Sequence, residues 1–261
     1  MKIMTTPQTS IIIPCFNEER WIAKVIESLL PCRAVSEIIV VNDGSTDKTL
    51  EILKSSSWQD KIKIISYKKN QGKGYAMATG VEKARGELVI FMDAHHLNVK
   101  NSHIKTLTKP LIKGQADAVL GTTTSRLPDP FWRFTGFRAY FKKDLLPHLN
   151  KIKEARLGAE ICLNEIFKKK RVKLTYPKGL VHLAKHQKMP ISQVPKASLI
   201  QLIEMTQALA QAKGIAPQKI KKLINAKKIK SLNALKRATQ KLKDKQILES
   251  LKEYIFSYLE R

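Results

Sequence analysis

Asp93 and His95 are the residues whose types and spacing most directly suggest chemistry. They follow an apolar run, Leu88–Met92, that is typical of a short strand buried on both faces. In an open parallel sheet, ligands bind just beyond the carboxyl ends of the strands, where these side chains are expected. A carboxylate and an imidazole two residues apart could share one divalent cation. The other interpretation is a solvated turn in which Asp93 only caps the following segment.

Three more polar loops follow predicted strands, at residues 14–19, 42–47 and 70–74. We expect all four loops at one edge of the sheet, where they would line one cleft. Glu18 and Asp43 can accept hydrogen bonds from ribose hydroxyls or a base N–H, and Lys73, between two glycines, can approach a phosphate closely. No G-x-G-x-x-G follows the first strand, and Gln71–Tyr75 lacks P-loop spacing. The loops therefore suit a metal-bound nucleotide better than a bare dinucleotide.

The elements that must position these loops alternate between strands and helices. Strands are predicted at residues 10–13, 37–41, 62–66, 88–92, 116–121 and 172–176. Helices are predicted at residues 18–30, from residue 48, and at residues 75–84, 137–149 and 158–170. Strands that alternate with helices of this length indicate β-α-β units with right-handed crossovers, and hence an α/β fold with a mostly parallel sheet.

The 261 residues carry a formal net charge of +26 and have a pI near 10.0. Such an excess draws a protein toward polyanions, namely nucleic acid, anionic lipid headgroups or phosphate-rich substrates. After Pro195 helical periodicity dominates and lysines are frequent. We therefore divide the chain into a main domain at residues 1–194 and a basic helical appendage at residues 195–261.

Cysteine usage and hydropathy indicate a compartment. Cys15, Cys32 and Cys162 lie far apart without a C-x-x-C pair, which argues against disulfides and fits a reducing cytosol. No apolar run reaches the roughly 18–20 residues that a membrane span needs, and Thr5–Ser10 is too polar for a secretory signal. We expect a cytoplasmic protein that the basic appendage holds peripherally at the inner, anionic membrane face.

Three segments, residues 11–19, 37–47 and 70–74, resemble the family 2 glycosyltransferases of GT-A fold, a Rossmann-like mixed, mostly parallel sheet flanked by helices. The resemblance implies a nucleotide-sugar donor, linked to UDP or GDP, with Mn²⁺ or Mg²⁺ at its diphosphate. It also implies donor contacts from several residues, with Lys73 near the nucleoside and the others around it: Pro14, Phe16, Glu18 and Asp43. Asp93 stands where the family has its metal-binding Asp-x-Asp.

The sequence departs from the family pattern after Asp93. His95 occupies the position of the second Asp, and His96 a position where a further acid is often found. A neutral imidazole ligates Mn²⁺ well but is a poor partner for Mg²⁺, which prefers oxygen. Either the site favours a softer metal, or His95 has lost the metal and the activity is altered.

Three short segments are similar to further parts of such enzymes. Residues 136–139 are similar to the acceptor-side segment of polyprenyl-phosphate glycosyltransferases, and residues 158–161 to the start of the family's catalytic-acid helix. His182 resembles a histidine that glucosyl-3-phosphoglycerate synthases use as a metal ligand. The alternatives are that Glu160 only stabilises a helix start and that His182 is a surface group.

These residues suggest a mechanism in which a metal ion held by Asp93, together with cationic side chains, neutralises the negative charge that develops on the leaving nucleoside diphosphate. A hydroxyl acceptor needs a general base, for which Glu160 is the candidate. A phosphate acceptor is already an anion, so cations would only have to position it. The candidate acceptor-binding residues are Arg126, Arg133, Arg138 and Lys142.

The sequence leads to a metal-dependent glycosyltransferase acting on a phosphate-bearing or lipid-linked acceptor. The alternative is a catalytically altered relative that only binds a nucleotide or a partner. Nucleic acid is the least supported partner, because the chain shows no aromatic stacking platform and no recognised reading motif. The oligomeric state does not follow from the sequence.

Overall fold

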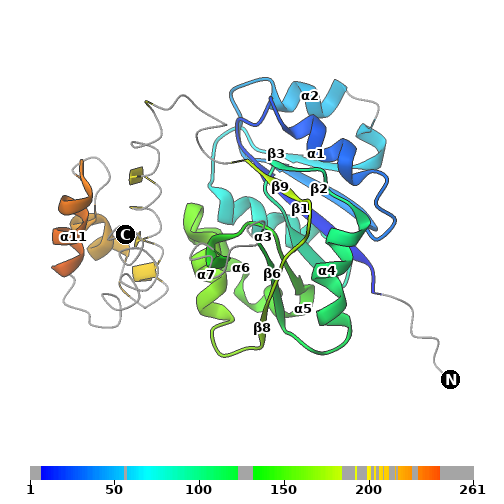
Figure 1. Cartoon of the computed structure of the whole chain (residues 1–261). Coiled ribbons are helices and arrows are strands. Elements are labelled where there is room, and N and C mark those ends of the chain that lie inside the picture. Colours follow the sequence, from blue (N-terminus) through cyan, green and yellow to red (C-terminus); the bar gives the residue numbers. More distant parts are fainter. Residues whose placement is uncertain are drawn as a thin grey trace.

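The computed structural model describes residues 7–55, 58–122 and 132–183, together with parts of the chain between residues 192 and 241. A seven-stranded sheet forms the centre, in the order β3-β2-β1-β4-β7-β6-β8 (Figure 1). Its strands are β1 (Thr9–Cys15), β2 (Glu37–Asn42), β3 (Lys63–Ser66), β4 (Leu88–Phe91), β6 (Ala118–Gly121), β7 (Arg138–Phe141) and β8 (Val172–Thr175). A small second sheet pairs β5 (His96–Leu97) with β9 (Val181–His182).

Helices cover both faces of the large sheet. The apolar cluster on one face includes residues of α1 (Ile22–Leu29), α2 (Thr49–Ser55) and α4 (Asn101–Ile112). The cluster on the other face includes residues of α3 (Lys73–Lys83), α6 (Leu149–Glu154) and α7 (Ala159–Ile166). Along β1, Ile11 and Ile13 contribute to the first cluster and Ile12 to the second, so the strand is buried on both sides.

The structure confirms the predicted mixed, mostly parallel sheet. The pairs β1–β2, β1–β4, β2–β3 and β6–β8 are parallel. The carboxyl ends of β1, β2 and β4 therefore lie at one edge. The prediction of one helix over residues 137–149 was wrong, because Arg138–Phe141 pairs antiparallel with both β4 and β6. Pairing on both sides overrides the local pattern, and only then do the short helices α5 (Lys142–Leu145) and α6 begin.

The loops after β1 and β2 are joined by direct hydrogen bonds. The side-chain Oδ1 of Asn17 accepts from the backbone N–H of Thr46 at 2.8 Å, and Asn17 adopts a left-handed φ of 57°. The backbone N–H of Glu18 donates to Oγ1 of Thr49 at 2.8 Å. These bonds hold the loop that follows β1 in a fixed position relative to the start of α2.

The described part of the appendage contains α10 (Pro217–Leu223) and α11 (Leu232–Gln240). Ser231 caps α11 by accepting from the N–H of Ala234. Buried residues of this region, among them Ile220 and Leu235, pack in one cluster with Ile161 of α7, beside which the helices lie in Figure 1. The predicted boundary at residue 195 lies outside the described residues and stays a prediction. Within the described residues, no helix combines the length and the apolarity of a membrane span.

Candidate donor and metal site

A pocket of about 460 Å³ lies at the edge of the sheet where β1, β2 and β4 end. Parallel strands place their following loops side by side, so residues far apart in sequence share this pocket. The five predicted donor residues all line it, together with Asp93 and His95: Pro14, Phe16, Glu18, Asp43 and Lys73. The other lining residues were not predicted as site residues: Cys15, Asn70, Gly72, Ala94 and Arg156. The predicted convergence of the four loops is therefore a feature of the structure, while each donor role stays a prediction.

Asp93 stands at the centre of the site and uses its two carboxylate oxygens differently. Oδ1 lies 2.5 Å from the Nζ of Lys73, whereas Oδ2 faces the imidazoles of His95 and His182. Burial alone would raise the pKa of Asp93, but Lys73 and the three neighbouring histidines together outweigh it and hold this pKa well below its usual range. Asp93 is thus an ionised carboxylate with one oxygen turned toward two nitrogen donors.

Lys73 joins Asp93 to Glu160. Its Nζ also lies 2.5 Å from Oε1 of Glu160, a buried residue in the first turn of α7. Burial by itself lowers the pKa of Lys73, but the combined effect of the two carboxylates is larger and raises it. The pKa therefore lies above its ordinary value, and the ammonium keeps its charge. Glu160 is therefore paired with a residue that lines the pocket and is not only an acid at a helix start.

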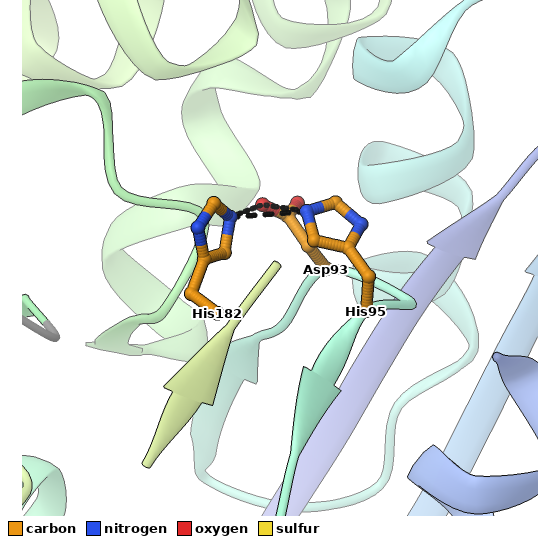
Figure 2. A group of neighbouring side chains, drawn as sticks. All are labelled: Asp93, His95 and His182. Carbon is orange, nitrogen blue, oxygen red and sulfur yellow. Dashed lines mark hydrogen bonds and ion pairs between the residues drawn. The ribbon is translucent and has the colours of Figure 1, made fainter. Parts of the chain in front are cut away.

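Asp93, His95 and His182 gather three ligand-type atoms at one point, as Figure 2 shows. The Nε2 atoms of the two histidines lie 3.0 Å apart, and Oδ2 of Asp93 lies 3.8 Å from His95 Nε2 and 3.9 Å from His182 Nε2. The circle through three atoms with these separations has a radius of about 2.1 Å, the length of a bond from a divalent metal to nitrogen or oxygen. One ion therefore fits within reach of all three atoms.

The small β5–β9 sheet brings His182 to this cluster. His96 pairs with His182 in the antiparallel register, which places His182 beside the turn that follows β4. His96 itself is 1% exposed, and its Nδ1 lies 3.2 Å from the carbonyl oxygen of Asp93. Burial is the main cause that lowers the pKa of His96 to about 3. His96 is thus a neutral core residue, and its neighbour His95 is the one that reaches the cluster.

Asp43 organises the glycine-bearing loop of the pocket. Its Oδ1 accepts from the N–H of Gln71 at 2.7 Å and its Oδ2 from the N–H of Gly72 at 2.8 Å. Burial, partly opposed by these bonds, raises the pKa of Asp43. Gly72 has a φ of 102°, which favours glycine, and its bond to Asp43 fixes the start of α3 next to Lys73.

Gly136 is a site residue whose role sequence reasoning missed. A Cβ at this position would collide with the carboxylate of Asp93. Only glycine lets the chain that enters β7 pass so close to that carboxylate. Arg156 was missed as well: it lines the pocket, has a left-handed φ of 48°, and its Nη1 donates to the carbonyl of Gln71 at 3.3 Å. No local signal in the sequence links Arg156 to residues 85 positions away.

The structure does not gather the four predicted acceptor residues. Arg126 lies outside the described residues. Lys142 was predicted wrongly: its Nζ donates to the carbonyl of Ala84, at the opposite edge of the sheet, because β7 runs antiparallel and carries it away from Asp93. Arg133, in the short 3₁₀ turn Trp132–Phe134, is half-buried beside α7 and lines a second cavity of about 330 Å³ that α7 and β6 also border.

Arg138 is fully buried and makes structural bonds. Its guanidinium donates to the carbonyls of Arg133, Thr135 and Glu160, to the side chain of Asn164 and to the hydroxyl of Tyr140. These acceptors lie on the turn before β7, on α7 and on β7 itself. The expected contact of Arg138 with an acceptor is therefore corrected to a structural role, because its donors are used inside the protein.

Comparisons with known proteins identify the family of this chain. The family model described as glycosyl transferase family 2 matches residues 10–172. A dolichyl-phosphate beta-glucosyltransferase of Trichomonas vaginalis is 26% identical over 211 residues, covering 72% of this chain and 62% of that protein. The dolichyl-phosphate beta-glucosyltransferase of Mus musculus is 35% identical over 101 residues, covering 34% and 31% of the two chains. The chain thus spans less than two thirds of the length of these curated relatives.

A solved structure shares the fold. Glucosyl-3-phosphoglycerate synthase from Mycobacterium tuberculosis, in complex with Mn²⁺, UDP-glucose and glycerol 3-phosphate, matches 80% of this chain and 81% of its own, with a TM-score of 0.60 and 21% identity. This likeness confirms the predicted GT-A fold. Because the family model covers more than half of its residues, the chain belongs to glycosyl transferase family 2.

Proposed function

We propose that the protein is a metal-dependent glycosyltransferase that takes a sugar from a UDP- or GDP-linked donor. The observation that carries the proposal is the placing of Asp93, His95 and His182 beside the predicted donor pocket, within reach of one cation. The relatives support it, because structures of the mycobacterial synthase contain UDP with Mn²⁺ or Mg²⁺. The fold alone would not define an activity.

The ligands of the metal would be Asp93, His95 and His182. When bound, the metal supplies positive charge for the diphosphate. Two imidazoles and one carboxylate favour Mn²⁺ over Mg²⁺, since Mg²⁺ prefers oxygen ligands. Lys73 keeps its charge and lines the same pocket, so its ammonium adds to the positive charge facing a leaving diphosphate. Pro14, Phe16 and Asp43 line the same pocket, and we assign them to the nucleoside.

Glu160 would act on the acceptor. Its carboxylate is held by Lys73, and its helix is fixed to β7 by Arg138. We assign Glu160 as general base for a hydroxyl acceptor, while a phosphate acceptor would need only positioning. Of the predicted cations, Arg133 lies beside α7, where its backbone carbonyl accepts from the side chain of Asn164.

For the acceptor we propose a phosphate-bearing molecule, either small or lipid-linked. The names of the relatives support this class, since one group acts on dolichyl phosphate and the mycobacterial synthase was solved with glycerol 3-phosphate. A lipid-linked acceptor would place the protein at a membrane surface, where a net charge of +26 favours anionic lipid by about 1 kcal/mol per nearby lysine. A cytoplasmic, peripheral location follows from that proposal.

The test is calorimetric titration of the full chain with UDP-glucose and with GDP-linked sugars, with and without Mn²⁺, followed by a transfer assay with glycerol phosphate and with a polyprenyl phosphate. Metal-dependent binding of one donor and transfer to one phosphate acceptor would support the proposal. Absence of binding to every donor would overturn it. Binding without transfer or hydrolysis would instead identify the catalytically altered relative.

A further inference from the structure

Glu18 lies behind the imidazole of His95, on the side away from the candidate metal position. Its Oε1 is 3.5 Å from Nδ1 of His95, while Nε2 of the same ring is 3.0 Å from Nε2 of His182. The two ring nitrogens of His95 therefore face different partners. One faces a carboxylate that can only accept, and the other faces the cluster of ligand-type atoms.

Hydrogen bonds hold the backbone of Glu18 in place on both sides of its side chain. Its N–H donates to Oγ1 of Thr49, and its carbonyl accepts from the N–H groups of Trp21 and Ile22 where the chain turns into α1. The side chains are 19% exposed for Glu18 and 11% exposed for His95, so bulk water screens their interaction only partly. The carboxylate is thus held next to the ring by the fold.

The chemistry of imidazole makes this arrangement consequential. A neutral imidazole carries one N–H, and an ionised carboxylate has only acceptor atoms. With the proton on Nδ1, facing Glu18, the lone pair of Nε2 points to the side where His182 and Asp93 converge. A carboxylate behind a ligating histidine fixes its tautomer and ring orientation and makes the nitrogen a better ligand.

We propose that Glu18 is a positioning residue of the metal site, which acts through His95 and sets its Nε2 as the metal-facing nitrogen. The proposal rests on the proposed metal dependence, and it assigns to Glu18 a role other than contact with the nucleoside. It arises from this chain's own residues, because an acid at position 95 would have no second nitrogen for Glu18 to hold. It predicts that Glu18 affects metal binding when no nucleotide is present.

The experiment is calorimetric titration of the full-length protein with MnCl₂ alone, in the absence of any nucleotide. Glu18→Ala is expected to weaken Mn²⁺ binding about 10- to 100-fold, the usual effect of losing such an outer partner. Glu18→Gln keeps an acceptor oxygen and is expected to fall between Glu18→Ala and the unmodified protein. The matched control is Glu19→Gln, which removes a neighbouring acid whose carboxylate accepts from the N–H of Lys48. This control is expected to change Mn²⁺ affinity less than about threefold.

A double-mutant cycle separates positioning from a simple charge effect. In a His95→Asp background, Glu18→Ala is expected to leave Mn²⁺ affinity unchanged or to raise it, because two carboxylates would then repel each other. An equal loss in both backgrounds would overturn the proposal, since Glu18 would be acting without His95. Thermal unfolding of each variant identifies any that fail to fold. If Glu18→Ala does not fold, Glu18→Gln replaces it in the comparison, because glutamine has nearly the same side-chain volume as glutamate.

A spectroscopic readout complements the affinities. With Co²⁺ in place of Mn²⁺, the visible absorption reports the ligands of the ion. Glu18→Ala is expected to change this spectrum in the same direction as His95→Ala, whereas an unchanged spectrum would contradict the proposal. If the unmodified protein binds neither metal, the metal dependence fails and this inference fails with it. If the unmodified protein binds Mn²⁺ and Glu18→Ala binds it equally well, only this inference fails.

Discussion

Lys73 and Asp93 form an ion pair that uses only one of the two carboxylate oxygens of Asp93. Nζ of Lys73 lies 2.5 Å from Oδ1 of Asp93, and Oδ2 remains turned toward the two imidazoles. The two residues come from different loops, one at the start of α3 and the other after β4. Because an ionised carboxylate has several acceptor sites, Asp93 can serve an ammonium and a metal at the same time. The ion pair thereby leaves Oδ2 of Asp93 directed at the candidate metal position.

Removal of the Lys73 ammonium is expected to destabilise the protein and weaken donor binding. Lys73→Met leaves two buried carboxylates, those of Asp93 and Glu160, without their shared partner, at a cost of about 3 kcal/mol in the free energy of unfolding. Urea unfolding measures this cost. The control is Lys68→Met, at an exposed lysine between β3 and α3. It is expected to change the free energy of unfolding by less than about 0.5 kcal/mol. Equal losses for both variants would contradict the assigned role of Lys73.

A methyl group at position 136 is expected to disturb the site without touching a ligand. Gly136→Ala places a Cβ against the carboxylate of Asp93, so that the carboxylate or the backbone before β7 must shift. We expect a loss of about 1–3 kcal/mol in unfolding free energy and at least tenfold weaker Mn²⁺ binding. Titration with MnCl₂ and urea unfolding measure the two effects. Unchanged Mn²⁺ affinity would show that the close contact between Gly136 and Asp93 does not set the geometry of the metal site.

Replacement of Arg138 is expected to lower the stability of the protein rather than to change acceptor binding directly. Arg138→Leu removes a buried guanidinium from five acceptors, three of them backbone carbonyls, and is expected to cost about 3–5 kcal/mol. Arg138→Lys is expected to recover little, because an ammonium lacks the planar fork of donors. Arg133→Met, by contrast, is expected to leave stability nearly unchanged and to raise KM for a phosphate acceptor. A large KM effect with intact stability in Arg138→Lys would contradict this division.

The ion pair between Asp117 and Arg171 is expected to contribute stability that disappears in acid. Hydrogen bonds from the Arg171 side chain and backbone lower the pKa of Asp117 to about 2. A folded-state pKa below the unfolded value of about 3.9 stabilises the protein above that value, and the contribution is lost as the pH falls toward 2. Asp117→Asn should therefore be less stable than the unmodified protein at pH 7, and the difference should shrink between pH 4 and pH 2. Urea unfolding at several pH values checks this. A difference that does not depend on pH would rule out the charge of Asp117 as its cause.

Much of the donor pocket was predictable because it follows from local sequence. Most of its residues lie in loops that follow a short apolar strand, and parallel strands present such loops at one edge. Thus Glu18, Asp43, Lys73 and Asp93 could be assigned to one cleft before any coordinates, and the structure places all four there.

The acceptor side was less predictable. Residues 138–141 read as part of a helix, but they form the strand between β4 and β6, which a local pattern does not reveal. That error also misplaced Lys142, since an antiparallel strand reverses which of its ends meets the pocket. Arg138 had the residue type of an anion-binding group, and only its burial shows that its donors are used internally.

The sequence by itself determined the α/β class, the four loops and the residue types that can hold a nucleotide and a cation, because these depend on short apolar runs and the polar residues that end them. Only the tertiary structure decided which nitrogen and oxygen atoms meet. His95 and His182 are 87 residues apart, and their 3.0 Å separation exists because β9 pairs with β5. The contact of Glu18 with His95 likewise depends on the pairing of β1 with β4, and that of Gly136 with Asp93 on the pairing of β7 with β4. Such contacts depend on long-range pairing, which fixes positions that no neighbouring residues encode.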